Sequence, residues 1–240
     1  MLTHRTRPPL AIPALALAAA GLMPATLYWT FFRAPFEATM GAAQKIFYLH
    51  VPAAMAMYAG ALACTLGSAI YLYNQSERAD AVARAGAEMA LFFGAMGVAG
   101  GSLWGKAAWG AYWSWEPRTL STVLQLALYA AYLTLRDFAG DGEAERKFAA
   151  ALGVLAAANV PIISYSVKKW GGNHPGGIIE GGGRGLGHVD MKIAFWLGVA
   201  AMVTLAAGLI ATRARLHLGA GRLAHAEGRA LELGLLGDEA

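Results

Sequence analysis

The sequence predicts an all-α, polytopic membrane protein with six transmembrane helices. Three observations carry this prediction. Hydrophobic residues make up 57% of the 240 residues and charged residues only 14%, whereas a soluble domain carries about 25% charged residues. The mean hydropathy is positive, at +0.44. Long uncharged runs divide the chain, and the charges gather in the shorter segments between them.

The uncharged runs mark the six predicted helices. A helix needs about 20 apolar residues to cross a hydrocarbon core of roughly 30 Å. The third and fourth runs are short by this measure, and we expect each to extend by a turn into flanking Ala, Gly and Trp. Small residues along the runs favour close helix packing in lipid. The runs cover residues 10–32, 46–73, 89–103, 119–135, 148–167 and 193–212.

The first run has two interpretations. His4, Arg5 and Arg7 precede it, as basic residues precede the core of a cleaved signal peptide. Its 23 uncharged residues exceed the signal-peptide core of about 7–15 residues. The length therefore favours a retained transmembrane helix.

Six spans place both termini on one side of the membrane. With the N-terminus cytoplasmic, 11 Lys and Arg residues lie inside and 8 outside, which agrees with the positive-inside rule. We therefore expect a multi-pass protein of the cytoplasmic (inner) membrane, with a membrane domain at 1–212 and a cytoplasmic tail at 213–240. In either orientation, residues 104–118 share a face with the loops at 33–45 and 168–192.

Several classes of protein are excluded. Cys64 is the only cysteine, so the chain has no disulfide framework and no cysteine-based zinc site. The net charge of +4 is small and scattered, and no nucleic-acid-binding motif is present. No Ser-His-Asp set, paired intramembrane carboxylates or phosphate-binding loop stands out. We expect a protein that is not an enzyme and that relies on a partner for any ATP hydrolysis.

A tryptophan-rich segment, WGKAAWGAYWSWEPR, occupies residues 104–118 and holds four of the seven tryptophans. An aromatic belt at the membrane surface would spread such residues over many helices. If this segment is helical, Trp109 and Trp113 lie one turn apart on one face, and Trp115 points the opposite way. The pattern predicts an amphipathic aromatic platform on the outer, periplasmic surface of the membrane.

Two histidines lie on the same face as this segment. His50 comes just before Pro52, a residue suited to the first turn of a helix, and a residue before proline avoids helical geometry. We therefore expect His50 just ahead of a helix that starts near Pro52. His174 follows the fifth run and also precedes a proline. The pair predicts two ligands for one centre; the alternative is that each is a hydrogen-bonded interfacial histidine.

The loop at 168–190 contains nine glycines. Each glycine costs about 1 kcal/mol relative to alanine in a helix, so the loop is not a regular helix throughout. His188 lies in this loop beside Asp190 and is a third, competing candidate ligand.

A flat, conjugated ligand with a metal at its centre and anionic edges fits these features, and haem has those properties. Two imidazoles can fill the axial positions of haem iron. Arg118, Lys106, Lys168 or Lys169 can meet its propionates by charge-assisted hydrogen bonds, or instead contact lipid headgroups. Glu116 would repel propionates, so we expect it to order Arg118 or a ring N–H.

The core WGAYWSW at residues 109–115, followed by Glu116, Pro117 and Arg118, resembles the tryptophan-rich WWD motif of the haem-handling family that includes CcmC, CcmF and CcsA. The short chain and six spans are most similar to the haem exporter protein C (CcmC) members. The stretches HVPAAMAMY and SVKKWGGNH are also similar to that pattern. Glu116 stands where Asp is common, and Tyr112 where Trp is frequent.

The resemblance implies a haem-delivery protein that holds haem b at the periplasmic face of the cytoplasmic membrane. It implies that two axial histidines grip the iron, that the tryptophans support the ring, and that the haem passes to the periplasmic chaperone CcmE. It also implies assembly with the ABC transporter subunits CcmA and CcmB and the small membrane protein CcmD. The implied cofactor-binding residues are His50, His174, Trp104, Trp109, Trp113, Trp115, Glu116 and Arg118.

Two alternatives remain. A CcsA-like cytochrome c synthase component would attach haem directly to apocytochrome. A small-solute transporter would place polar groups and broken helices at the membrane midplane. Only Gln125, Asn159 and Pro161 hint at the transporter, and the last two also fit a packed kink.

Overall fold

The computed structural model describes residues 9–138, 142–175 and 186–235. Helices make up almost all of this part of the chain, which confirms the predicted all-α class for the described residues. The short element η1 is a π-helical continuation of the first helix. In chain order, the elements are α1 (Ala11–Tyr28), η1 (Trp29–Arg33), α2 (Gln44–Asn74), α3 (Glu77–Trp109), α4 (Pro117–Phe138), α5 (Glu143–Ala157), α6 (Asn159–Trp170) and α7 (Val189–Glu232).

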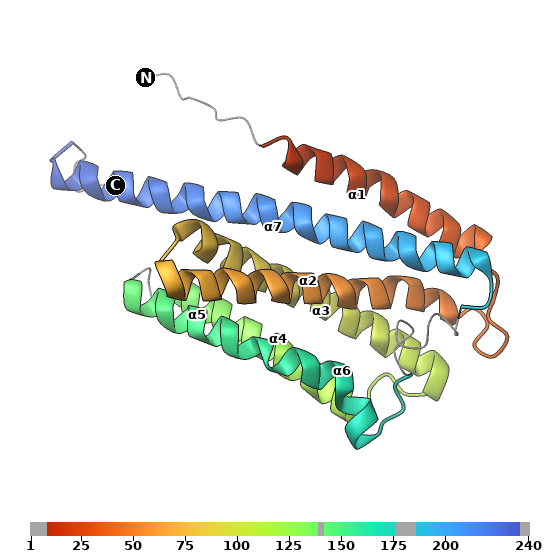
Figure 1. Cartoon of the computed structure of the whole chain (residues 1–240). Coiled ribbons are helices and arrows are strands. Elements are labelled where there is room, and N and C mark those ends of the chain that lie inside the picture. Colours follow the sequence, from red (N-terminus) through yellow and green to blue (C-terminus); the bar gives the residue numbers. More distant parts are fainter. Residues whose placement is uncertain (1–8, 139–141, 176–185, 236–240) are drawn as a thin grey trace.

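The helices form an elongated bundle whose chain connections gather at its two ends (Figure 1). Helix α7 packs between α1 on one side and the α2–α3 pair on the other, while α4, α5 and α6 cover the opposite side of that pair. One end, which we call the tryptophan end, collects the segments 34–43, 110–116 and 171–175. The α2–α3 connection lies at the opposite end, together with the end of α4 and the start of α5.

Among the described residues, five helical segments are long and apolar enough to cross a membrane, so the chain is a multi-pass membrane protein by length and composition. Helix α4 has 22 residues and is about 33 Å long at 1.5 Å per residue, but it is less apolar. The sixth predicted crossing therefore stays a prediction. The five segments are Ala11–Arg33, Gln44–Asn74, Glu77–Trp109, Glu143–Trp170 and Val189–Glu232.

The polarity of α4 comes from one buried face. Ser121, Gln125, Tyr129, Tyr132 and Arg136 recur every three or four residues and are all buried against neighbouring helices. A helix with such a face turns its polar side chains toward the bundle interior rather than toward lipid. This explains why the fourth uncharged run is short and less hydrophobic than the others.

The α2–α3 pair is packed backbone against backbone. A Cβ atom on Gly86 would lie 2.4 Å from the backbone nitrogen of Cys64, and one on Gly60 would lie 2.6 Å from that of Ala90. Small residues permit this approach, as expected for helices that pack in lipid. Cys64 is fully buried and unbridged at this contact.

The predicted start of the second helix is wrong. Helix α2 begins at Gln44, so His50 lies inside the helix and Pro52 in its third turn. Proline removes the hydrogen bond to the carbonyl four residues earlier, here that of Tyr48. Gly198 of α7 packs over this point, since a Cβ there would lie 2.7 Å from the Tyr48 oxygen and 3.0 Å from Pro52 Cγ. Close packing by a neighbouring helix lets α2 continue through its proline.

The fifth uncharged run forms two helices, α5 and α6, with a break at Ala158. Asn159 Nδ2 donates to the Ser121 carbonyl at 2.8 Å and to Gln125 Oε1 at 2.9 Å. Gln125 Nε2 in turn donates to the Ala156 carbonyl at 3.2 Å. These bonds tie the break to α4, which is the packed kink expected from Asn159 and Pro161.

Helix α7 runs without a break through the predicted boundary between residues 1–212 and 213–240. Beyond that boundary, Arg213 and His217 both contact the carboxylate of Glu88 on α3; Arg213 Nε donates at 2.6 Å and His217 Nε2 lies at 2.8 Å. The helix is therefore anchored to α3 past residue 212. The division into a membrane domain and a cytoplasmic tail stays a prediction.

Candidate functional site

The tryptophan-rich segment is not one helix. Helix α3 continues to Trp109 and ends at Gly110, whose φ of +78° is left-handed. Glycine adopts this conformation without steric cost and commonly ends helices. Residues 110–116 are non-helical, and α4 starts at Pro117. The expectation that Trp109 and Trp113 lie one turn apart on a helical platform is therefore wrong.

The four tryptophans instead form two pairs. Trp104 and Trp109 pack edge to face with ring centroids 4.9 Å apart, and Trp113 and Trp115 do so at 5.3 Å. Such T-shaped contacts are favourable for aromatic rings. Trp104 also lies 6.5 Å from the ring of His174, whereas Trp115 is largely exposed. The result is an aromatic cluster beside a histidine rather than the expected amphipathic platform.

The structure brings His50 and His174 side by side. Their ring centroids are 6.4 Å apart, with 44° between the ring planes. His50 comes from α2, and His174 from the segment that follows α6. One metal atom held between two imidazoles needs a similar separation, because each metal–nitrogen bond is about 2 Å and the ring centre lies roughly another 1 Å away. The role of the pair as ligands stays a prediction.

The tautomer of His50 follows from its hydrogen bond. Its Nδ1 lies 2.8 Å from the Gly97 carbonyl of α3, and a carbonyl only accepts, so Nδ1 donates. Nε2 then keeps a lone pair, the arrangement usual for metal-binding histidines. Glycines on α3 make room for the ring, since a Cβ on Gly101 would lie 2.9 Å from His50 Cε1.

The Nδ1 atom of His174 has two neighbours, and the pKa of the ring is lowered. Its Nδ1 is 3.2 Å from Arg118 Nη1 and 3.0 Å from the Pro175 carbonyl. Burial, reinforced by the charge of Arg118, lowers the pKa of His174 to about 4. The imidazole is therefore neutral near pH 7, as metal binding requires.

The carboxylate of Glu116 holds the His174 segment in place. Glu116 is buried, and its Oε2 accepts hydrogen bonds from the backbone N–H groups of Asn173 at 2.7 Å and His174 at 3.3 Å. Gly172 has φ +141°, and a Cβ there would lie 2.8 Å from Oε2. The sequence-based expectation that Glu116 orders Arg118 or a ring N–H is wrong, because its carboxylate accepts from backbone N–H groups instead. These partners lie in the loop after α6, and no local sequence pattern reveals them.

Arg118 and two tryptophans offer N–H groups without an acceptor. Arg118 Nη2 donates to the Ser164 carbonyl at 3.1 Å, but Arg118 Nε is buried and has no partner in the described part of the chain. The same holds there for Trp104 Nε1 and Trp113 Nε1. Buried polar groups are normally hydrogen-bonded. A ligand that carries acceptors, such as the propionates of haem, fits this set of donors.

Two of the other candidate cations, Lys106 and Lys168, have partners of their own. Lys106 Nζ donates to the Gly110 carbonyl at 2.9 Å and lies over the Tyr112 ring at 5.4 Å. Lys168 lies 5.6 Å over the ring of Tyr165. Of these three cations, Arg118 is the one that contacts a candidate ligand.

His188, the competing candidate, stands at the start of α7. Its Nδ1 accepts the backbone N–H of Asp190 at 3.2 Å and caps the helix. Trp29 Nε1 donates to Asp190 Oδ1 at 3.0 Å and ties this corner to η1. Residues 176–185 of the glycine-rich loop lie outside the described residues, so its predicted irregularity is not tested there.

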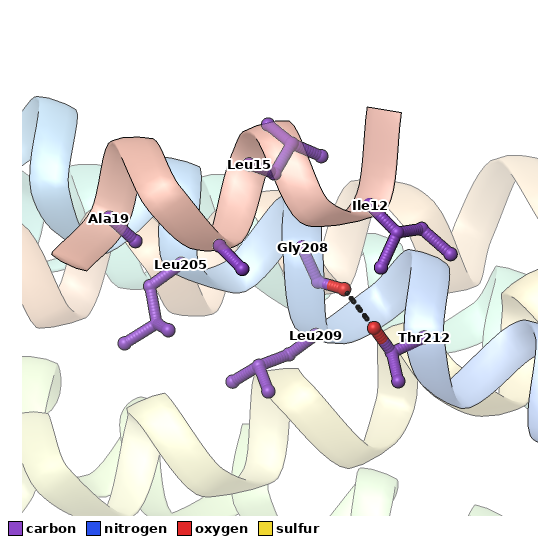
Figure 2. Close-up of a pocket in the computed structure, with 8 residues that line it drawn as sticks. Ile12, Leu15, Ala19, Leu205, Gly208, Leu209 and Thr212 are labelled. Carbon is purple, nitrogen blue, oxygen red and sulfur yellow. Dashed lines mark hydrogen bonds between the residues drawn. The ribbon is translucent and has the colours of Figure 1, made fainter. Parts of the chain in front are cut away.

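A small cavity lies elsewhere, between α1 and α7 (Figure 2). Its volume of about 90 Å³ is below the roughly 300–1,000 Å³ of typical small-molecule sites. The lining is apolar except for Thr212, whose hydroxyl donates to the Gly208 carbonyl at 2.8 Å. The lining of this cavity offers no charged or histidine side chain for binding a metal or an anion.

Comparisons with known proteins identify the family of this chain. The family model described as "Heme exporter protein C" matches residues 5–227. "Heme exporter protein C" of Escherichia coli K12 is 34% identical over 69% of this chain and 67% of its own length. The protein of the same name from Bradyrhizobium diazoefficiens is 32% identical over 77% of this chain and 68% of its own. The one from Haemophilus influenzae is 27% identical over 86% and 84%.

Proposed function

Because the chain belongs to the haem exporter protein C family, we propose that it holds haem between His50 and His174 and delivers it to a partner for cytochrome c maturation. The family supports the general role, that of a membrane component in haem delivery. The residue assignments rest on the geometry of this chain. The observation that carries them is the 6.4 Å separation of two imidazoles contributed by different segments.

The two histidines are the proposed axial ligands. His50 presents a lone pair on Nε2 because its Nδ1 is bonded to the Gly97 carbonyl. His174 is neutral at physiological pH because its pKa is lowered to about 4. Haem b is the proposed cargo, since two nitrogen ligands fill both axial positions of its iron without a covalent link to the protein.

The groups around the histidines have distinct proposed roles. Trp104 and Trp109 flank the porphyrin ring on the side of His174. Trp113 and Trp115 extend the aromatic surface toward solvent. Arg118 binds a propionate through its guanidinium. Glu116 supports the segment that carries His174 and does not contact haem.

We further propose the following setting. The tryptophan end faces the periplasm, with both termini cytoplasmic, in the inner membrane. Haem at this end is accessible to the chaperone CcmE, and the ABC transporter subunits CcmA and CcmB, with CcmD, supply the energy and complete the assembly. The chain itself acts as a delivery component rather than an enzyme. The family supports partners of the ABC exporter type in general.

The proposal is tested by haem titration of the full chain purified in detergent. The wild type should give the absorption spectrum of a low-spin, bis-histidine haem. His50→Ala and His174→Ala should each convert it to a weaker, high-spin form, and the double variant should bind no haem specifically. His225→Ala, at an exposed position of α7, is the control. Unchanged low-spin spectra in both single variants would reject the ligand pair.

Transfer assays separate delivery from synthesis. Mixing the haem-loaded protein with a periplasmic haem chaperone should deplete its haem. Direct transfer to an apocytochrome in the absence of a chaperone would instead favour the synthase alternative.

A further inference from the structure

His50 and His174 differ in what determines the position of the ring proton. At His50, Nδ1 faces one partner, the Gly97 carbonyl at 2.8 Å, which requires a proton on Nδ1. At His174, Nδ1 lies 3.0 Å from the Pro175 carbonyl and 3.2 Å from Arg118 Nη1. A carbonyl accepts and a guanidinium donates. One ring nitrogen cannot satisfy both partners at once.

Each partner therefore selects a different tautomer of His174. With the proton on Nδ1, the ring donates to the Pro175 carbonyl and Nε2 keeps a lone pair for a metal. With the proton on Nε2, Nδ1 accepts from Arg118 and Nε2 cannot bind a metal. Both forms carry the same charge. The choice between them depends on where the Arg118 guanidinium lies.

Arg118 is held in a position from which it can determine the tautomer of His174. Its Nη2 donates to the Ser164 carbonyl of α6 at 3.1 Å, which directs Nη1 at His174. A hydrogen bond from a charged donor is stronger than one between neutral groups, so the pair with Arg118 should prevail over Pro175. At the same time Arg118 Nε is buried without a partner in the described part of the chain. A carboxylate can engage a guanidinium with two parallel hydrogen bonds and is a better partner than a neutral imidazole.

We propose that Arg118 acts as a latch: its hydrogen bond to Nδ1 keeps His174 in the tautomer that cannot bind a metal, and a carboxylate of the bound porphyrin displaces that bond. The proposal rests on the function proposed above. Before haem binds, Arg118 holds His174 with its proton on Nε2. When a propionate takes the guanidinium, the Nε2 proton passes to solvent and Nδ1 gains one, so the number of bound protons is unchanged. Nδ1 then donates to the Pro175 carbonyl, and the Nε2 lone pair is ready for iron. The site thus selects metalloporphyrins with free carboxylates over those without.

The same hydrogen bond also affects the release of haem. Once the carboxylate is withdrawn, Arg118 returns to Nδ1 and the tautomer that cannot hold a metal is again favoured. His50 has no such device. His174 is therefore the ligand that engages last and leaves first.

The haem-free protein provides the first test. In ¹⁵N NMR of the full chain with labelled histidine, His174 of the wild type should show the proton on Nε2. Arg118→Leu should move it to Nδ1, because the Pro175 carbonyl is then the remaining partner. Arg33→Leu, which removes a cation paired with Asp190 at the same end of the bundle, should leave His174 unchanged. A wild-type His174 with its proton on Nδ1 would overturn the latch even if the variants failed to fold.

The second test compares haem with its dimethyl ester, in which both propionates are blocked. The wild type should bind haem in the low-spin form. It should bind the ester at least about tenfold more weakly, since one charge-assisted hydrogen bond is lost and the iron also lacks His174, which leaves a high-spin form. Arg118→Leu should bind the ester in the low-spin form, and Arg33→Leu should behave as the wild type.

The outcomes separate the two proposals. Identical low-spin binding of both porphyrins by the wild type would overturn the latch and leave the haem site intact. Failure of Arg118→Leu to rescue the ester would also overturn it. Absence of haem binding by the wild type would instead reject the proposed function itself.

Discussion

The buried carboxylate of Glu116 accepts a hydrogen bond from the backbone N–H of His174, 58 residues further along the chain. This bond and its companion to Asn173 connect the end of the tryptophan-rich segment to the loop that carries a candidate ligand. In the proposed site, the acidic residue of the motif therefore positions the histidine rather than contacting haem. Four predictions follow from this relationship and from the packing around it.

Glu116→Leu should weaken haem binding and remove the contribution of His174 to the spectrum. The two backbone donors would lose their acceptor inside the site, at a cost of about 1–3 kcal/mol. Glu37→Leu is the matched control, because Glu37 also accepts two backbone N–H bonds, from Thr39 and Met40, in a loop without a candidate ligand. Haem titration of both variants measures the difference, and equal affinities would argue against the positioning role.

Gly101→Ala should disturb His50, whereas Gly100→Ala should be tolerated. The new methyl group would lie 2.9 Å from His50 Cε1 at position 101 but 3.4 Å from His50 Cβ at position 100. Both substitutions favour the helix by about 1 kcal/mol, so helix stability does not distinguish them. Haem titration and thermal unfolding in detergent provide the two readouts. Equal haem affinity in the two variants would contradict the close approach of α3 to the His50 ring.

Gly86→Ala should destabilise the bundle. The added Cβ would meet the backbone nitrogen of Cys64 at 2.4 Å and the carbonyl oxygen of Gly60 at 2.7 Å, and backbone cannot move aside as a flexible side chain can. Overpacking of this kind typically costs about 1–3 kcal/mol. Gly21→Ala, at a helical position with open space around it, should stabilise the protein slightly. Thermal unfolding in detergent compares the two, and a stable Gly86→Ala variant would refute the tight α2–α3 contact.

The fourth prediction concerns pH in the haem-free protein. The pKa of His174 is lowered to about 4 by burial and by Arg118, against about 6.5 for an unperturbed histidine. Between these values the unfolded chain binds the proton and the folded one does not, so stability should fall as the pH drops from about 6.5 toward 4. NMR titration of His174 should give a midpoint near 4, and Arg118→Leu should raise it. A wild-type midpoint near 6.5 would show that the ring is not buried.

Local composition was sufficient to predict the helical class and the five spanning segments found among the described residues, while the sixth span and the roles of the candidate residues stay predictions. Runs of uncharged residues enter a bilayer at low cost whatever their tertiary contacts. The spanning segments around Cys64 and Gly198 are therefore recognisable without a structure. The alternation of spans also puts His50, His174 and the tryptophans at one end. Each of these inferences depends on neighbours in sequence.

The tertiary structure decided the rest. The helix through Pro52 depends on Gly198 of α7 packing over the freed Tyr48 carbonyl. The partner of Glu116 depends on how α4 and α6 meet. The competition between Arg118 and Pro175 for His174 depends on the contact of Arg118 with Ser164 of α6. Hydrogen bonds between segments far apart in sequence form only where backbone packing brings donors and acceptors within about 3 Å, and no local pattern encodes that distance.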